Sequence, residues 1–203
     1  MAVKRIGLLG GSFDPVHKAH IELAETAIAT LSLDQLQIIP AANPWQRSPL
    51  IATPQQRLEM LELACAHNDR IVVNPSEIER GGKTYTIDTI NELAPDANYY
   101  WLLGSDQLEN FCTWHRWSDI ARKVILVVAR RPNSSAQIPD RLAKHLKRLE
   151  RTVIELPFTP SNISATQIRG NLAHNLPVDD MLDANVHNYI TRHRLYLPKP
   201  TSS

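Results

Sequence analysis

The chain has 203 residues, of which 43% are hydrophobic and 21% charged, so it can bury a sizeable core and fits one globular domain or one domain with a small helical appendage. Its formal net charge of +1 gives no reason to expect nucleic acid or another polyanion as a partner, and no apolar run reaches the ~20 residues that cross a membrane. Two cysteines far apart, and an N-terminal segment too short and too charged for a signal peptide, favour a reducing compartment, and we expect a cytoplasmic protein.

The first predicted strand and the first predicted helix are joined by a turn of unusual composition. Residues 3–9 are a short apolar segment typical of a buried strand. Gly10 and Gly11 follow, and because glycine has no Cβ a ligand can approach the backbone closely there. His17 and His20 then lie on one face at the start of the helix, where free N–H groups and the helix dipole suit a phosphate. The turn is therefore a candidate polyphosphate site, at which we expect His17 and His20 to add positive charge.

This turn has two other interpretations. Two histidines at helical spacing can bind zinc, but no HExxH motif accompanies them and no Cys or carboxylate is an obvious third ligand. A tight turn with two surface histidines is the plainer alternative, because paired glycines after a strand are common. The spacing also matches neither GxGxxG nor the GxxxxGK loop that is followed by Ser or Thr.

Strands and helices alternate along the rest of the chain. Strands are predicted at 36–40, 70–73, 98–103, 124–129 and 152–156, and helices at about 18–31, from 54 on, from 84 or 86 to about 93, at about 139–151 and from 164 on. Thr53 and Gln56 form a capping box that begins the second helix, with Pro54 at its first position. This alternation predicts an α/β fold, a Rossmann-like doubly wound parallel sheet with a small C-terminal helical part.

Polar or glycine-rich segments follow three of these strands. The first strand ends at Gly10, the second runs into a loop that contains Asn43, and the fourth ends at Gly104 and Asp106. Ligands of doubly wound sheets bind beyond the carboxyl ends of the strands, at the point where the strand order reverses. We therefore expect these three segments to meet at one crevice.

A second phosphate site is predicted near the C-terminus. Ser164 and Gln167 form a capping box, so a helix begins there, and Arg169 lies close to that helix start. Free N–H groups, hydroxyls and a guanidinium together suit a phosphate. Without context this is a capped helix with an exposed arginine.

Two tryptophans stand three residues apart after the fourth strand. Such a pair usually packs in a core, and this is the role expected of Trp117. Trp114 lies in a polar setting beside His115, so it is a candidate platform on which an aromatic or pyridinium ring stacks. The basic helix at 139–151 lacks aromatic residues between its charges, and a solvated helix face explains it better than a nucleic-acid surface.

These segments resemble a known family. The turn matches the GxFxPxHxxH signature of the nucleotidylyltransferase superfamily, and the second site resembles its ISxTxxR motif. Within that superfamily the chain resembles the bacterial nicotinate-nucleotide adenylyltransferases over nearly its whole length. The segments that carry this closer likeness are TYTIDTI (Thr84–Ile90), GSDQLENFCTWHRW (Gly104–Trp117), VARRP (Val128–Pro132), SNISATQIR (Ser161–Arg169) and YITRHRLY (Tyr189–Tyr196).

The resemblance implies one nucleotidylyltransferase domain over residues 1–197, with its helical part at about 161–197 and a loose tail at 198–203. It implies that ATP and nicotinate mononucleotide give deamido-NAD and pyrophosphate with Mg²⁺, by direct attack of the 5′-phosphate on the α-phosphorus. A homo-oligomer is compatible with it. It assigns catalytic roles to His17, His20 and Arg169; ATP binding to Gly10, Gly11, Ser12, Phe13, His17, His20, Gly104, Asp106, Ile163, Ser164 and Arg169; and nicotinate-nucleotide binding to Asn43, Arg47, Thr86, Trp114 and His115. It assigns no protein ligand to the metal.

The chain departs from the family pattern at two places. Ala19 stands where glycine is common, and the loop after the second strand reads Asn43-Pro44-Trp45-Gln46-Arg47 instead of NPPHK or VPPHR. Two rival functions stay open. One is a related transferase acting on nicotinamide mononucleotide, or on both pyridine nucleotides. The other is a regulatory module that binds nucleotide without turnover.

Overall fold

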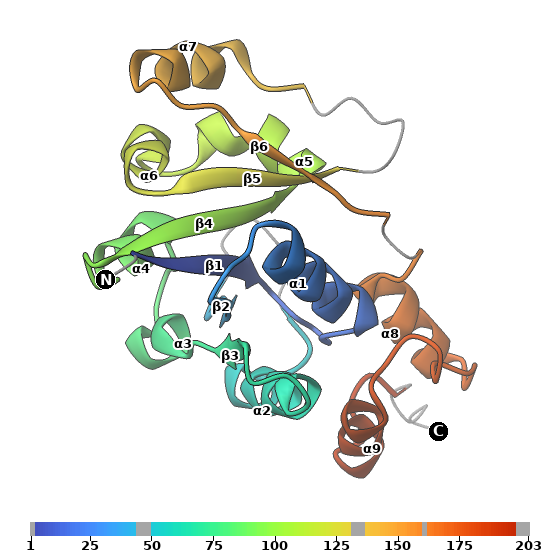
Figure 1. The fold of residues 1–203 in the computed structure, drawn as a ribbon. Coiled ribbons are helices and arrows are strands. Elements are labelled where there is room, and N and C mark those ends of the chain that lie inside the picture. The colour runs from blue at the N-terminus through green and yellow to red at the C-terminus, as the bar shows by residue number, and fades with distance from the viewer. Residues whose placement is uncertain (1–2, 44–49, 131–136, 160–161, 198–203) are drawn as a thin grey trace.

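Six strands form one all-parallel sheet in the computed structural model, which describes residues 3–43, 50–130, 137–159 and 162–197 (Figure 1). The spatial order is β3-β2-β1-β4-β5-β6, so the order reverses between β1 and β4. The strands are β1 (Lys4–Gly11), β2 (Gln35–Pro40), β3 (Ile71–Val73), β4 (Ala97–Gly104), β5 (Ile125–Arg130) and β6 (Ile154–Pro157). The predicted Rossmann-like doubly wound sheet is confirmed.

The helices of the described residues are α1 (Lys18–Thr30), α2 (Pro54–Cys65), α3 (Ser76–Arg80), α4 (Thr86–Asn91), α5 (Ser105–Glu109), α6 (Trp117–Lys123), α7 (Asp140–Arg148), α8 (Ala165–Ala173) and α9 (Ala184–Arg192), with a 3₁₀ turn at Phe111–Thr113. The sequence did not predict α3, α5 and α6, because five to seven residues are too few to display a helical hydrophobic period. The helix expected at 139–151 ends early, since Glu150 adopts a left-handed φ of 55° that a helix cannot continue.

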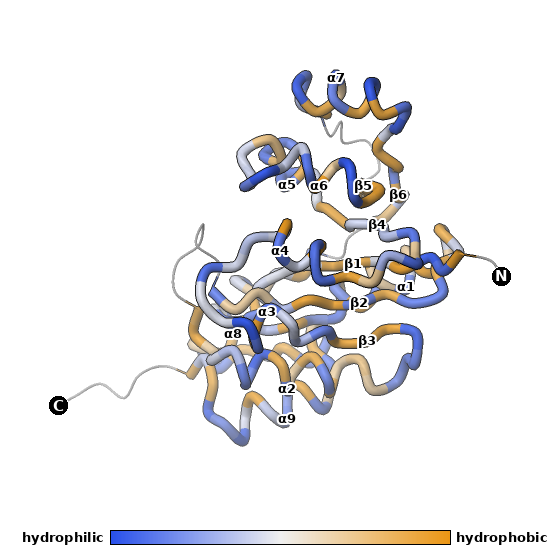
Figure 2. Tube along the Cα trace, turned by 90° about the vertical axis from the view of Figure 1, so that its left-hand side faces the viewer, coloured by the Kyte–Doolittle hydropathy of each residue, from blue (hydrophilic) through white to orange (hydrophobic). Residues whose placement is uncertain are grey.

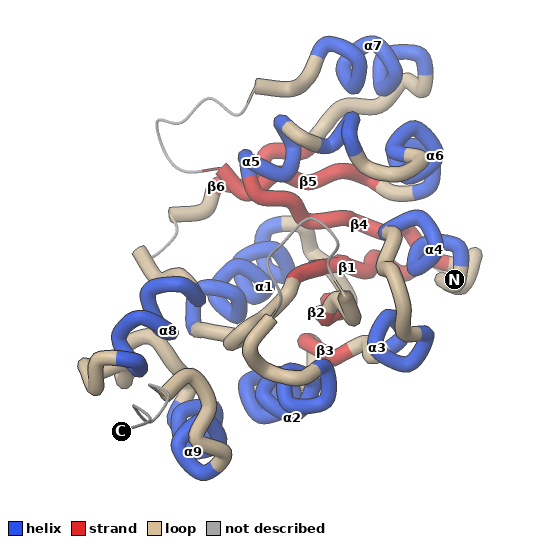
Figure 3. Tube along the Cα trace, turned by 180° about the vertical axis from the view of Figure 1, so that it is seen from behind, coloured by secondary structure: helices blue, strands red, loops and turns tan. Residues whose placement is uncertain are grey.

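The sheet is buried on both faces, as parallel sheets are. Successive strand residues point to opposite sides, so Leu9 and Leu102 join the core under α1 and α2, while Leu8 and Trp101 join the core under α4 and α6. Figure 2 shows the apolar colouring concentrated on β1, β2 and β3 inside the molecule. Figure 3 shows α4 and α6 lying over the side of the sheet that faces the viewer.

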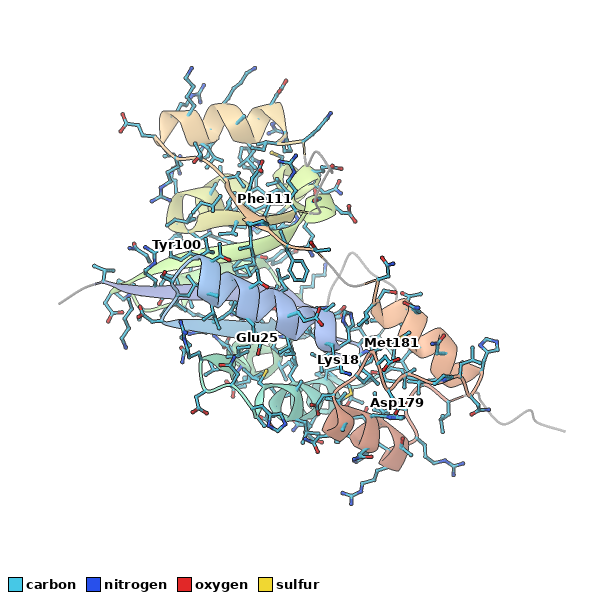
Figure 4. All side chains as sticks on the ribbon, turned by 45° about the vertical axis from the view of Figure 1, so that its right-hand side comes forward. Lys18, Glu25, Tyr100, Phe111, Asp179 and Met181 are labelled. Atoms are coloured by element: carbon cyan, nitrogen blue, oxygen red, sulfur yellow. The ribbon has the colours of Figure 1, made fainter. Side chains whose placement is uncertain are left out.

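The C-terminal helices are tied to the start of α1. The Lys18 N–H donates to the Met181 carbonyl at 3.0 Å, and the Lys18 Nζ donates to the Asp179 carbonyl at 2.9 Å. Figure 4 labels these three residues where the segment before α9 meets α1. None of the described helices has the length and apolar character that a membrane crossing requires.

Candidate active site

A pocket opens beside the carboxyl ends of β1 and β4, where the strand order reverses. Its cavity volume is about 160 Å³, less than the ~300–1,000 Å³ of sites that enclose a drug-sized ligand, and therefore suited to a ring-sized group. It lies where the sequence predicted a crevice. The lining residues are Gly10, Gly11, Ser12, Ala41, Glu77, Thr84, Tyr85, Thr86, Trp101, Gln107, Trp114, His115 and Ile120.

Three of the residues expected to bind the nicotinate nucleotide, Thr86, Trp114 and His115, line this pocket. The half-buried Trp114 ring packs against Phe111 at a centroid distance of 5.3 Å and edge-on against Trp101 at 6.5 Å, so its orientation is fixed before a ligand arrives. The remaining two expected residues follow β2.

Asn43 is exposed at the end of the segment after β2. Its N–H donates to the Oγ1 of Thr84, a lining residue, at 3.4 Å. This contact brings the loop after β2 to the rim of the pocket. Arg47 lies outside the described residues, as do Trp45 and Gln46.

Gly10 and Gly11 line the pocket, and packing within the protein also leaves little room for a side chain at either position. A Cβ on Gly10 would stand 3.1 Å from the Trp101 ring, and a Cβ on Gly11 would stand 2.9 Å from the Phe13 ring. Phe13 is 2% exposed with a left-handed φ of 48°, and its ring packs beneath Gly11. What Phe13 can offer to a nucleotide is therefore main chain, because its side chain is buried.

His17 and His20 lie together at the start of α1, as expected. Their rings stack at a centroid distance of 3.7 Å, and the His17 N–H donates to His20 Nδ1 at 3.3 Å. Burial lowers the pKa of His17 to about 4, so its imidazole is neutral at pH 7. We expected both histidines to supply positive charge. In the free chain His17 instead offers a neutral imidazole for hydrogen bonding.

The start of α1 also offers fewer free donors than its position suggests. Its first N–H, that of Lys18, is bonded to the Met181 carbonyl, and the His20 N–H is bonded to the His17 carbonyl at 2.9 Å. A phosphate at this helix start therefore depends more on side chains than on the backbone groups of the first turn.

The second predicted phosphate site reaches the first turn through Arg169. Its Nη1 donates to the Asp14 carbonyl at 2.7 Å, and its Nη2 donates to Thr166 Oγ1 at 3.3 Å. Ser164 caps α8 by accepting the Gln167 N–H at 3.2 Å. The structure thus brings the C-terminal arginine to the turn that carries both histidines.

The other residues expected at the nucleotide lie around these two sites. Ile163 is half-buried and packs against the core under α1, while Gly104 and Asp106 are exposed at the start of α5. A Cβ on Gly104 would meet nothing within 4 Å, so that position is open to a ligand. None of the three lines the pocket described above.

Arg57 is fully buried, and the sequence analysis predicted no role for it. Its Nη1 donates to the Ser12 carbonyl at 2.8 Å and its Nη2 to the Ala42 carbonyl at 3.2 Å, so it joins the turn after β1 to the loop after β2. Its spacing of four and seven residues from Leu61 and Ala64 placed it on the buried face of α2, and that pattern could have revealed it.

Glu77 was missed for a different reason, because it lies on the short helix α3. It lines the pocket, is 5% exposed, and accepts a hydrogen bond from Thr89 Oγ1 at 2.6 Å. Burial raises the pKa of Glu77 to about 7, against the opposing effects of Thr89 and Arg80. Tyr85, Trp101 and Gln107 also line the pocket without having been predicted.

The described residues contain no group of three or more His, Cys, Asp or Glu side chains placed to hold a metal ion. Mg²⁺ in nucleotide sites is held largely by phosphates and water, with one or two carboxylates. The exposed Asp106 in the first turn of α5 is a carboxylate of that kind. The donor set is therefore compatible with a magnesium ion that arrives with the nucleotide.

Comparisons with known proteins agree with this geometry. The family model "Cytidylyltransferase-like" matches residues 8–171. A protein of Bordetella petrii named "Probable nicotinate-nucleotide adenylyltransferase" is 56% identical, covering 96% of this chain and 100% of that protein. One of the same name from Albidiferax ferrireducens is 39% identical over 96% of this chain and 98% of its own length.

A solved structure of Plasmodium falciparum nicotinic acid mononucleotide adenylyltransferase complexed with NaAD has the same fold, with a TM-score of 0.74 at 20% identity, covering 95% of this chain and 97% of that one. Fold and site together define the chain as a nucleotidyltransferase of the cytidylyltransferase-like family. Within that class it belongs to the nicotinate-nucleotide adenylyltransferases.

Proposed function

We propose that the chain transfers the adenylyl group of ATP to nicotinate mononucleotide, giving deamido-NAD and pyrophosphate in NAD biosynthesis. The observation that carries the proposal is the pocket at the β1–β4 reversal, which joins Gly10–Ser12 of the first turn to Thr86, Trp114 and His115. The relatives' names and the nucleotide complexes of the structural neighbours support the same assignment.

The chemistry needs alignment and charge neutralisation, with no protein nucleophile. An oxygen of the acceptor 5′-phosphate forms a bond to the ATP α-phosphorus, and the bond from that phosphorus to the bridging oxygen breaks as pyrophosphate leaves. Two anions must approach each other, so the residues that bind and orient them lower the barrier.

The chain's own groups divide that task. Trp114 stacks on the pyridine ring. The N–H groups at Thr86, where α4 begins, have no acceptor within their own helix, and they donate to the carboxylate of the nicotinate. On the ATP side Arg169 supplies a permanent positive charge, and His17 and His20 supply hydrogen bonds. Bound Mg²⁺ would add charge neutralisation on the phosphates, with Asp106 as its candidate protein contact. We also propose a cytoplasmic enzyme, in keeping with its free Cys65 and Cys112.

The test is an assay of the purified chain with ATP, Mg²⁺ and a panel of acceptors: nicotinate mononucleotide, nicotinamide mononucleotide, phosphopantetheine and glycerol 3-phosphate. Pyrophosphate and dinucleotide are both measured. We expect kcat/KM to favour nicotinate over nicotinamide mononucleotide at least about tenfold, because the amide sets an NH₂ against donors and leaves buried groups unpaired at ~1–3 kcal/mol each. A ratio near one would indicate a dual-specificity enzyme. Binding of ATP without turnover of any acceptor would indicate a nucleotide sensor.

A further inference from the structure

Asp14 is the point where distant parts of the chain meet. It precedes His17 by three residues and is 3% exposed. Its carboxylate accepts hydrogen bonds from the Ile51 N–H at 2.8 Å, the Ala52 N–H at 3.1 Å and the Tyr196 hydroxyl at 2.7 Å. One buried side chain thus joins the first turn, the segment before α2 and the last described residues of the chain.

The main chain of the same turn is held by two arginines. Arg169 donates to the Asp14 carbonyl at 2.7 Å, and Arg57 donates to the Ser12 carbonyl at 2.8 Å. The orientation of the Asp14 peptide therefore sets where the Arg169 guanidinium stands, and Asp14 leads directly into the His17 N-cap of α1. Both proposed phosphate-binding groups depend on this short segment.

The backbone of Tyr196 adopts a conformation that is unfavourable for its residue type. It is 6% exposed and has a left-handed φ of 62°, which is unusual for a bulky aromatic residue. Such a backbone persists where the surrounding contacts over-determine it. Burial and the hydrogen bond to Asp14 raise the pKa of Tyr196, so the hydroxyl keeps its proton and donates it to the carboxylate.

We propose that Asp14 and Tyr196 form a positioning pair, through which the end of the chain fixes the catalytic geometry of its first turn. The pair touches neither substrate. It holds the Asp14 peptide so that the Arg169 guanidinium and the His17 imidazole face the same phosphates. This role rests on the proposed adenylyl transfer. Since a misplacement of about 1 Å can cost about 100-fold in rate, loosening one hydrogen bond here lowers kcat without removing any group that binds substrate.

The experiment compares Tyr196→Phe with Tyr189→Phe. Tyr189 lies on α9 and donates its hydroxyl to Glu59 Oε2 on α2 at 2.6 Å, so both variants lose a tyrosine–carboxylate hydrogen bond in the C-terminal part of the chain. Tyr189 donates to α2 and stacks on His193, away from the first turn, and it serves as the matched control. The readouts are kcat, KM for ATP and for nicotinate mononucleotide, and the thermal midpoint of each variant.

We expect Y196F to lower kcat by about 10- to 100-fold with both KM values within about threefold of wild type, and Y189F to keep wild-type kcat. A merely structural role would lower the thermal midpoint of Y196F but leave kcat per folded molecule unchanged. If Y196F is partly unfolded, kcat is measured with trimethylamine oxide, which favours the folded state. A wild-type kcat for Y196F, or an equal loss in both variants, overturns the positioning pair alone. A wild-type chain without turnover overturns the proposed function and the pair with it.

Discussion

At the scale of single residues, His17 shows how far burial can change the role of a motif residue. From the sequence, a histidine at a helix start is expected to be a positively charged group that binds phosphate. In the folded chain it stacks on His20 at 3.7 Å, and two protonated imidazoles at that distance would repel each other. Because burial lowers the His17 pKa to about 4, the permanent positive charge beside the first turn comes from Arg169 and the buried Arg57 and not from His17.

Trp114 and Trp117 differ in a way that a substitution can test. Trp114 lines the pocket, whereas Trp117 packs against Phe111, His145 and the Arg141 guanidinium. We expect Trp114→Ala to raise KM for nicotinate mononucleotide by about 5- to 150-fold and KM for ATP much less, since stacking of a base-like ring is worth ~1–3 kcal/mol.

Trp117→Ala is the control for this prediction. It removes an indole from the same segment, so it should lower stability and leave both KM values near those of wild type. Equal changes in the two KM values for Trp114→Ala would show that Trp114 is structural.

At the scale of elements, α2 and α8 both begin with a hydroxyl side chain as the N-cap, but only α8 carries a residue proposed to bind the ATP phosphates. Thr53 caps α2 in a full capping box with Gln56, and Ser164 caps α8, which carries Arg169. Replacing either cap with alanine should cost about 0.5–2 kcal/mol of stability. We expect Ser164→Ala also to raise KM for ATP several-fold, while Thr53→Ala leaves it unchanged. Chemical denaturation and ATP titrations measure the two effects. Similar KM values in the two variants would argue that α8 serves structure alone.

Element-level prediction from sequence succeeded where a pattern spans enough residues. The long apolar strands and α1 show clear hydrophobic periods, and the strand alternation fixes a doubly wound sheet and the place of its crevice. The short helices were not predicted, because too few residues display a hydrophobic period. Since α3 was among them, the pocket residue Glu77 was not predicted either. The family resemblance pointed to Thr86 and Trp114, and both line the pocket. The hydrogen bond between Asp14 and Tyr196 joins residues 182 positions apart, and no local pattern encodes it.

At the scale of the whole molecule, two buried groups, His17 and Glu77, change the stability with pH in opposite directions. The His17 pKa is lowered from 6.5 to about 4, so the unfolded chain binds more protons between those values and stability is lost as pH falls through them. The Glu77 pKa is raised from 4.5 to about 7, so the folded chain binds more protons there and stability is lost as pH rises. Between about pH 5 and 6.5 the two slopes nearly cancel.

Removing either group should therefore leave the other group's contribution to the pH dependence of the free energy of unfolding uncompensated. From pH 5 to pH 7 we expect the free energy of unfolding of Glu77→Gln to rise by about 2 kcal/mol relative to wild type, and that of His17→Gln to fall by about 2 kcal/mol. Urea unfolding of the three proteins at both pH values measures this. Taking each variant relative to wild type cancels the contributions of the other titrating groups. Since neither quantity depends on turnover, the measurement stands whatever the acceptor is. Parallel pH profiles in all three proteins would mean that His17 and Glu77 titrate in the folded chain as they do in the unfolded one. In that case His17 would be charged below about pH 6.5, and the phosphate site would carry the additional positive charge that its sequence suggested.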